Sequence, residues 1–523
     1  MTEPTRALSD SADAAPDPDA DQPRRAVGAG RFRWAMVWTA LGALIPGLGL
    51  WHAGRRVAGS IVMGVFVALL LAIAYLGLAG KDRLIELGTN VDVLNGLVVG
   101  LAVLAVAWVV VIVTSHLSLR PAQPSGAQRF AGGVLVGILA LAVATPLAVG
   151  AEYARSTANF LGTVFDDDPV PSGQPTPDQS ANPWGSKERL NVLVIGGDSG
   201  TNRDPSLGLR ADTVMVASID LKTGVSTLFS LPRQTARIPF PKSSPLHKYY
   251  PNGFYDGVDG ANSNYFLNAM YNNIPARIPR NLLGDNVKNL GAEVMKVGVG
   301  EALGLGKLDY FVIVNMDGFK QFINALGGIT LNVNYRIPIG GKTTERVPPK
   351  GYIEPGPNKH LDGRLALWYA RGRYGLTTGD YSRMERQRCV INAVVQQAQP
   401  QVVLTNFEKI AAAGSKTIQT DIPRRMLKPM IELALKVKNT NLHSVVFQPG
   451  VAGWVSSNPP WPAVQRRVQQ ALREADRAEA GKTATASPSA SPGESGSPSA
   501  KPTKKPSGKS DDLSDSCAYH PAK

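Results

Sequence analysis

Residues 369–397 read YARGRYGLTTGDYSRMERQRCVINAVVQQ, and the rest of the chain is organised around this stretch. It opens with Arg371 and Arg373 on a polar loop, and the glycines that follow predict a turn. Asp380 then stands where a helix N-cap belongs. An amphipathic helix is expected after it, with Arg383 and Gln387 on its opening turns.

This helix start predicts an anion-binding site. Asp380, Arg383 and Gln387 share roughly one helix face, because residues spaced by three or four positions are neighbours on a helix. Guanidinium groups keep their charge, and at a helix N-terminus they suit an anion with several oxygens, such as a phosphate or pyrophosphate. The alternative is a solvated basic helix start, since runs of charge usually face solvent.

Earlier in the chain, charged residues stand at the ends of predicted strands. Asp198 follows a buried strand at 189–195, and Asp212 opens the next strand at 213–219. Two carboxylates at the ends of neighbouring strands can hold a hard divalent cation, Mg²⁺ or Mn²⁺, beside a phosphate. In the alternative, Asp198 caps a turn and Asp212 pairs with Arg210. Arg233 ends a third strand at 225–231 and is expected in the same crevice, where open α/β sheets bind ligands.

The alternation of strands and helices predicts an α/β domain, with a mixed central sheet flanked by helices on both faces. Further strands are predicted at 310–314, 329–333 and 442–447. Helices are predicted at 287–303, 361–370, 382–398, 424–437 and 461–478.

An α-helical membrane domain is predicted at 34–150. Segments 60–79, 93–115 and 130–150 are each apolar over about the length that a bilayer core requires. Segment 34–52 either spans or re-enters, because Pro46 and two glycines interrupt it. A re-entrant segment leaves three spans and keeps the arginines at 55, 56, 120 and 129 on the cytoplasmic side, as the positive-inside rule asks. The region after residue 150 would then lie outside the cell membrane, whereas four spans would reverse this.

The remaining segments are predicted to be polar connectors. Residues 1–33 form a disordered cytoplasmic N-terminus, residues 151–186 a linker, and residues 480–523 a low-complexity tail of Ser, Pro, Ala, Thr and Lys. The net charge of +14 indicates an anionic partner. No nucleic-acid-binding motif is visible, so anionic lipid or a phosphorylated polymer fits a membrane protein better than nucleic acid.

The chain has two cysteines, Cys389 and Cys517. An oxidising exterior and an even cysteine count predict that they form a disulfide, which would tie the tail to the helix of the opening stretch. The alternative is a buried Cys389 that packs as a small apolar residue, with an unrelated free Cys517.

Six segments, in chain order, resemble the LytR-CpsA-Psr family, whose members join lipid-linked anionic polymers to peptidoglycan in Gram-positive cell walls. They are NVLVIGGDS, RADTVMVASID, FSLPR, YFVIVNMDGF with LGGITLNV, HLDGRLALWYARGR and GDYSRMERQ, between about residues 190 and 442. The resemblance implies a catalytic domain at 187–479. It implies metal binding by Asp198 and Asp212 and pyrophosphate binding by arginines, with Asp380 and Gln387 as further polar site residues. The implied arginines are Arg210, Arg233, Arg371, Arg373 and Arg383.

The implied function is a phosphotransferase with Mg²⁺ or Mn²⁺ as its cofactor. It would move a glycopolymer from a polyprenyl pyrophosphate to a sugar hydroxyl of peptidoglycan. A non-catalytic regulator that binds polymer or lipid phosphate, and a lipid pyrophosphatase, remain alternatives. The chain departs from the family at Gln234, where aspartate is common, and in segment 240–262, which follows no recognisable pattern. Its several membrane segments also replace the usual single anchor.

Overall fold

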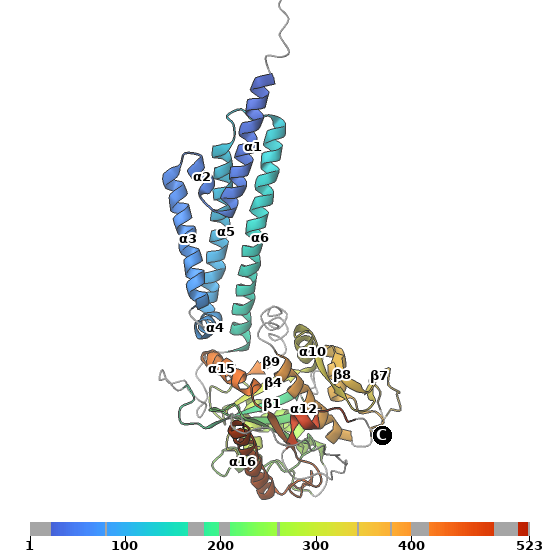
Figure 1. Ribbon diagram of the computed structural model, residues 1–523. Coiled ribbons are helices and arrows are strands. Elements are labelled where there is room, and N and C mark those ends of the chain that lie inside the picture. The colour runs from blue at the N-terminus through green and yellow to red at the C-terminus, as the bar shows by residue number, and fades with distance from the viewer. Residues whose placement is uncertain are drawn as a thin grey trace, which may run out of the picture. The chain divides into compact units, whose positions relative to one another are not determined.

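The computed structural model of this chain divides into two units, Met1–Arg155 and Ser156–Lys523 (Figure 1). The structure describes residues 22–78, 81–165, 183–197, 210–258, 262–342, 345–376, 379–398, 418–485 and 511–520.

The first unit is a set of helices. Three of them are long and apolar enough to cross a membrane: α3 (Arg56–Leu78), α5 (Val91–Leu119) and α6 (Gly126–Val164). They contain the predicted spans except for Ala79, which lies outside the described residues. A short α4 (Lys81–Thr89) lies between α3 and α5 in the chain. Because α6 runs to Val164, the predicted linker at 151–186 is wrong over its first part, where the chain is still helical.

The interrupted segment at 34–52 forms a helix, a turn and a second short helix. α1 (Gln22–Leu44) ends before Pro46, and α2 (Leu48–His52) begins after Gly47. Gly47 has φ of 95°, and a Cβ there would lie 2.4 Å from the carbonyl oxygen of Gly59, so only glycine fits this turn. α1 already begins at Gln22, which corrects the predicted disorder up to residue 33.

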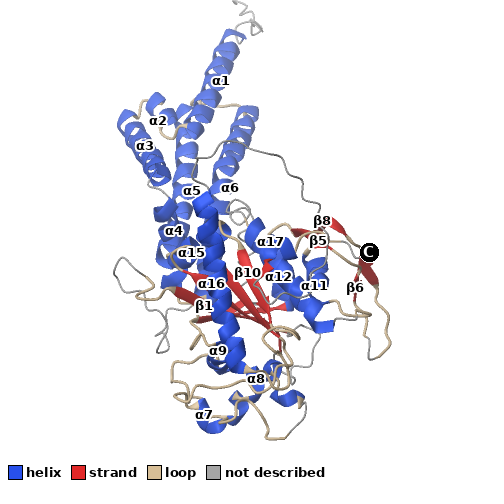
Figure 2. Ribbon diagram, turned by 60° about the horizontal axis from the view of Figure 1, so that its bottom comes forward, coloured by secondary structure: helices blue, strands red, loops and turns tan. Residues whose placement is uncertain are grey.

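The second unit is built on a mixed sheet, as predicted, and this sheet has seven strands (Figure 2). Its strand order is β11 (Asp511–Asp512), β10 (Leu442–Val446), β3 (Ser226–Leu231), β2 (Ala211–Asp220), β1 (Arg189–Gly197), β4 (Tyr310–Asn315) and β9 (Ile418–Thr420). β1 runs parallel to β4 and antiparallel to β2, and β3 runs parallel to β10. The carboxyl ends of β1, β3 and β4 therefore lie at the same edge of the sheet as the start of β2.

The side chains of alternate residues in β1 point to opposite faces of the sheet, as they do in any β-strand. Leu193 and Ile195 belong to the main core, which α9 (Leu290–Leu303) and α16 (Trp461–Thr485) cover. Leu190 and Val192 belong to a core on the other face, with Leu433 of α15 (Leu427–Lys438). The unassigned segment at 240–262 adds Phe240, Leu246 of α7 (Leu246–Tyr249) and Phe254 to the main core, so these apolar side chains anchor it.

A second, smaller core lies beside the opening stretch. It joins α10 (Met316–Ala325), α11 (Gly363–Arg371) and α12 (Gly379–Gln397) to two-stranded sheets. One sheet pairs β5 (Ile329–Val333) with β8 (Gly356–Leu361), and the other pairs β6 (Ile337–Ile339) with β7 (Gly351–Ile353). The strand predicted at 329–333 is thus correct, but it lies outside the central sheet.

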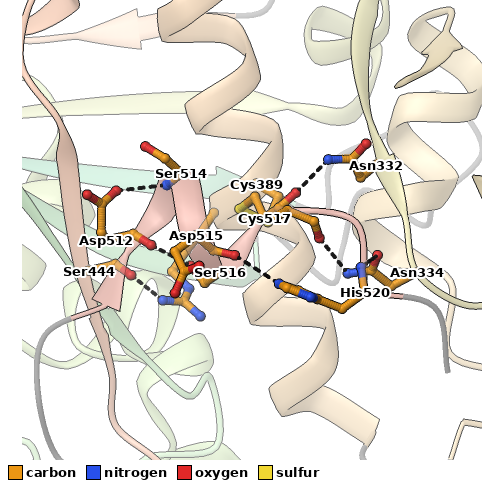
Figure 3. Close-up of a disulfide and its surroundings, with 12 residues drawn as sticks. Asn332, Asn334, Cys389, Ser444, Asp512, Ser514, Asp515, Ser516, Cys517 and His520 are labelled. Carbon is orange, nitrogen blue, oxygen red and sulfur yellow. Dashed lines mark hydrogen bonds between the residues drawn. A yellow bond between two sulfur atoms is a disulfide. The ribbon is translucent and has the colours of Figure 1, made fainter. Parts of the chain in front are cut away.

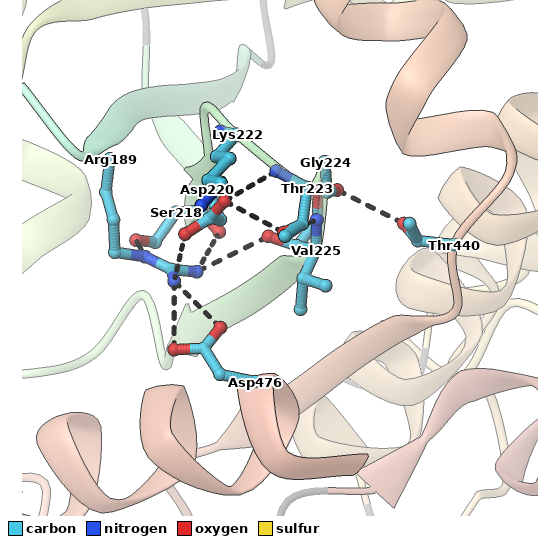
Figure 4. A network of polar contacts seen from close by, with 10 residues as sticks. Arg189, Ser218, Asp220, Lys222, Thr223, Gly224, Val225, Thr440 and Asp476 are labelled. Carbon is cyan, nitrogen blue, oxygen red and sulfur yellow. Dashed lines mark hydrogen bonds and ion pairs between the residues drawn. The ribbon is translucent and has the colours of Figure 1, made fainter. Parts of the chain in front are cut away.

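A polar network holds α16 at the end of the sheet opposite the carboxyl ends of β1 and β3 (Figure 4). The Arg189 guanidinium donates to Asp476 Oδ1 of α16 at 3.1 Å and to Ser218 Oγ of β2 at 3.1 Å. Asp220 Oδ1 accepts two backbone N–H groups of the β2–β3 turn, at Lys222 and Thr223. The network joins a strand, a turn and a helix that are far apart in the sequence.

The C-terminal residues 511–520 are built into this unit, which corrects the prediction that 480–523 is wholly a low-complexity tail (Figure 3). The predicted disulfide between Cys389 of α12 and Cys517 is present. β11 pairs with β10, and Leu513 of α17 (Leu513–Ser516) is fully buried. Cys517 and Ala518 offer their carbonyl oxygens to the side chains of Asn332 and Asn334.

Candidate functional site

The candidate site lies where β3 ends and α12 begins. Arg233, just after β3, donates from Nη1 to Asp212 Oδ1 at 2.7 Å and from Nε to Asp380 Oδ2 at 2.9 Å. Its partners lie 21 and 147 positions away in the chain. The predicted crevice is therefore formed by Asp212 and Arg233 from the sheet and Asp380 from α12.

Asp380 is the centre of the cluster. Besides Arg233, it accepts from Arg373 Nη1 at 2.8 Å and lies 3.5 Å from Arg383 Nη2. It occupies the first turn of α12 and not the predicted N-cap position, because the helix already begins at Gly379. Its carboxylate therefore does not cap the helix but contacts and orients Arg233, Arg373 and Arg383.

Arg383 reaches back to the sheet. It is 2 % exposed, and its Nη2 donates to the backbone oxygen of Asp212 at 2.9 Å. Burial lowers the pKa of Arg383 to about 10 against the charge of Asp380, so it remains charged at neutral pH. The prediction of a solvated basic helix start is wrong for this residue.

The charges of the cluster fix the ionisation of its acid. Burial by itself would raise the pKa of Asp380, but Arg383, Arg233 and Arg373 outweigh burial and hold that pKa below its ordinary value. Burial opposes the charge of Arg233 in turn, and Asp212 and Asp380 raise its pKa. Asp380 is therefore ionised at neutral pH and is a weak base.

Four predicted site residues remain: Arg371, Gln387, Arg210 and Asp198. Arg371 ends α11 and does not lie on the predicted loop, and its Nη1 contacts Met316 Sδ. Gln387 donates to the backbone oxygen of Ala370 at 3.4 Å, which places it beside the last turn of α11. Arg210 is half-buried, and Asp212 pairs with Arg233, so the alternative pairing of Asp212 with Arg210 is wrong. Asp198 lies outside the described residues.

The site is a narrow crevice lined by Asp212, Arg233, Arg383 and Gln387 with apolar residues of β2 and β3. The side chains of Asp212, Arg233 and Asp380 are each about one-fifth exposed, so a ligand can reach them from solvent. Gln234, the departure from the family pattern, is exposed, and Arg233 finds its carboxylates on Asp212 and Asp380 instead.

Two observations bear on a metal ion. Within the described ranges, no three His, Cys, Asp or Glu side chains form a cluster that could hold one. Asp212 contributes one described carboxylate, and Oδ1 of that group is already bound by Arg233. Magnesium is typically held by one or two carboxylates together with substrate phosphates, so Asp212 fits as one ligand of such a site.

Sequence reasoning missed Arg386. This buried arginine of α12 donates from Nη2 to the backbone oxygen of Gly372, between Arg371 and Arg373. The run RMERQR holds three arginines, and only Arg383 fell on the face chosen from the helix period. The sequence signal for Arg386 is that α12 carries three arginines within six residues, so a helix that packs against a core must bury at least one of them.

Comparisons with known proteins identify the family of this chain. Residues 163–475 match the model of the LytR_cpsA_psr family. A polyisoprenyl-teichoic acid–peptidoglycan teichoic acid transferase of Enterococcus faecalis is 30% identical over 275 residues, covering 51% of this chain and 74% of the relative. Biofilm regulatory protein A of Streptococcus mutans is 28% identical, covering 55% of this chain and 63% of the relative. A crystal structure of a Streptococcus agalactiae protein matches 55% of this chain and 88% of its own with a TM-score of 0.40 and 25% identity.

Proposed function

We propose, from the premise that this chain belongs to the LytR-CpsA-Psr family, that it transfers a glycopolymer from a polyprenyl pyrophosphate to a sugar hydroxyl of peptidoglycan. A relative of known name, 30% identical, is a teichoic acid–peptidoglycan transferase. The observation that carries the proposal is the convergence of Arg233, Arg373 and Arg383 on Asp380 beside Asp212. This arrangement of positive charge suits a substrate that carries a pyrophosphate group.

The reaction needs charge stabilisation more than covalent chemistry. The acceptor hydroxyl oxygen attacks the phosphorus that carries the glycan, and the bond from that phosphorus to the oxygen of polyprenyl phosphate breaks. The electron pair leaves with polyprenyl phosphate, and the hydroxyl proton passes to a base or to solvent. Arginines that bind the phosphoryl oxygens stabilise the charge that develops in this step. Asp380 positions these arginines, because its lowered pKa makes it a poor proton acceptor.

A divalent cation, Mg²⁺ or Mn²⁺, belongs to the proposal. Asp212 would hold it together with Asp198, at the start of β2 and after β1 respectively. When bound, the cation supplies further neutralisation of the phosphate oxygens. Asp212 would then be shared between the cation and Arg233, which contacts Oδ1.

The place of action is the outer side of a bacterial cell membrane. Three apolar helices, α3, α5 and α6, provide a multi-pass anchor, and the arginines near their ends favour a cytoplasmic N-terminus. Reporters that work in only one compartment, fused after Arg120 and after Ser186, test this arrangement. A cytoplasmic signal from the Ser186 fusion would contradict the proposal.

The decisive experiment incubates the full chain in detergent with lipid-linked anionic polymer, Mg²⁺ and peptidoglycan fragments. The expected product carries a phosphodiester between polymer and peptidoglycan. Polymer phosphate released to water would support a pyrophosphatase, and binding without turnover would support a regulator. Arg373→Ala should lose a contact to phosphate of about 1.5 to 3 kcal/mol. Arg336→Ala is the matched control, since Arg336 pairs with Glu354 and both side chains are more than half exposed.

The metal is tested by Asp212→Ala. A metal-assisted transferase should lose turnover in this variant while binding of the lipid pyrophosphate weakens only in part, because the arginines still hold it. A polymer-binding regulator would lose function in the arginine variants and keep it in Asp212→Ala. Full polymer attachment in cells whose only copy carries both Asp198→Ala and Asp212→Ala would end the metal hypothesis.

A further inference from the structure

The segment from Ala370 to Arg373 is held through its backbone. Gly372 closes α11 by donating its N–H to the oxygen of Trp368 at 2.7 Å, and the chain then leaves the helix with φ of −54° and ψ of 131°. A Cβ at position 372 would lie 2.5 Å from the backbone oxygen of Pro338 in β6. The chain therefore passes β6 at a distance that only glycine permits.

Arg386 of α12 binds the backbone of this segment. Its Nη2 donates to the oxygen of Gly372, and its Nη1 donates to the hydroxyl of Tyr335 at 2.9 Å. The residue is 3 % exposed, and among the described residues it has no ion-pair partner. Its guanidinium carbon also lies 5.7 Å from the centroid of the Tyr335 ring. A buried cation without a carboxylate partner among the described residues is costly, so packing by itself gives no reason for an arginine here.

Gln387 provides a second hydrogen bond from α12 to the backbone of the segment. Its Nε2 donates to the oxygen of Ala370 at 3.4 Å, so neighbouring residues of α12 hold the carbonyl groups on either side of Arg371. About two turns earlier, the same helix carries Asp380, which accepts from Arg373. Residues of α12 therefore bind both the backbone of this segment and the side chain of Arg373.

We propose that Arg386 is a positioning residue for the phosphate-binding arginines. By fixing the Gly372 carbonyl against Tyr335, it sets the direction in which the chain leaves α11, and so brings the Arg373 guanidinium to Asp380. The planar guanidinium is required because it donates to two separate oxygens, which a lysine ammonium on a flexible stem does poorly. This inference rests on the proposed function, since Arg373 matters only if the site binds phosphate.

The test measures kcat and KM of the full chain in detergent for transfer from lipid-linked polymer. Arg386→Lys should lower kcat about 10-fold to 100-fold, the effect of a displacement near 1 Å at a reacting site, with a smaller change in KM. Tyr335→Phe removes one of the two anchoring oxygens and keeps the shape, so a smaller loss of kcat is expected. Arg388→Lys is the matched control, because Arg388 is a buried arginine of α12 that donates instead to Ser444 of β10.

A double-mutant cycle separates positioning from a general effect on folding. If Arg386 acts through Arg373, Arg386→Lys should cost little more once Arg373→Ala is present, because effects that share one path are not additive. Additive losses, or a wild-type kcat in Arg386→Lys, would overturn this inference while leaving the proposed function intact. Wild-type transfer by Arg373→Ala would instead overturn the proposed function. If Arg386→Lys does not fold, Tyr335→Phe combined with Arg373→Ala provides the same cycle.

Discussion

Loss of the disulfide between Cys389 and Cys517 should destabilise the second unit substantially. The bond joins residues 128 positions apart, and closing a loop of that length removes about 5 kcal/mol of unfolded-state entropy at 25 °C in the chain-entropy model. Cys517→Ala should therefore lower the unfolding free energy by up to about this amount. The noncovalent contacts of residues 511–520, such as the burial of Leu513, remain in the variant.

Pulse proteolysis of the full chain in increasing urea, with the fragment of the second unit followed on a gel, measures the effect. With a urea dependence of about 3 kcal/mol/M, the midpoint should fall by up to about 1.7 M. Cys389→Ala and the double variant should show the same shift, because either change removes the same bond and the effects do not add. Ser516→Ala is the control within the same segment, and its exposed hydroxyl should change the midpoint little.

Two results would refute this reasoning. One is a midpoint that stays the same in the presence and absence of reductant, when mass spectrometry of the untreated protein shows the disulfide intact. The other is a double variant whose loss equals the sum of the two single losses, since that would assign the effect to packing at each cysteine.

Three further predictions concern buried charge and pH. Lys296 is fully buried between Glu293 at 2.8 Å and Asp421 at 2.6 Å, and Glu293 also pairs with Lys307. Lys296→Met should cost about 3 to 5 kcal/mol because it removes the buried cation between two carboxylates, and the loss should appear as a lower urea midpoint. Because the pKa of Asp380 is lowered, its contribution to stability is complete above the ordinary aspartate pKa of about 3.9 and is lost as pH falls through the lower folded-state value. Asp380→Asn should thus be less stable than wild type at pH 7, and the two unfolding curves should converge in strong acid; a constant gap would contradict this. Since the pKa of Arg383 is about 10, affinity for a non-hydrolysable lipid pyrophosphate should fall as pH rises through that value, and Arg383→Gln should bind more weakly without this pH dependence.

The sequence by itself determined the local elements and the chemistry of the site. The apolar runs at 189–195 and 213–219 predicted β1 and β2, because short apolar segments rich in valine and isoleucine are typical of buried strands. The clustered arginines predicted an anion site, since their charge persists in any fold. The even cysteine count predicted the disulfide, which the structure contains.

Only the tertiary structure decided which of these residues meet. Arg233 and Asp380 are 147 positions apart, and the strand order brings them to 2.9 Å. Asp380 looked like a helix cap from its neighbours in sequence, but the three arginines that surround it compete more strongly for its carboxylate. Arg386 became visible only through the backbone of Gly372 and the hydroxyl of Tyr335. Local propensity depends on a few adjacent residues, whereas these contacts depend on which faces the whole chain buries together, and no short stretch of sequence specifies that.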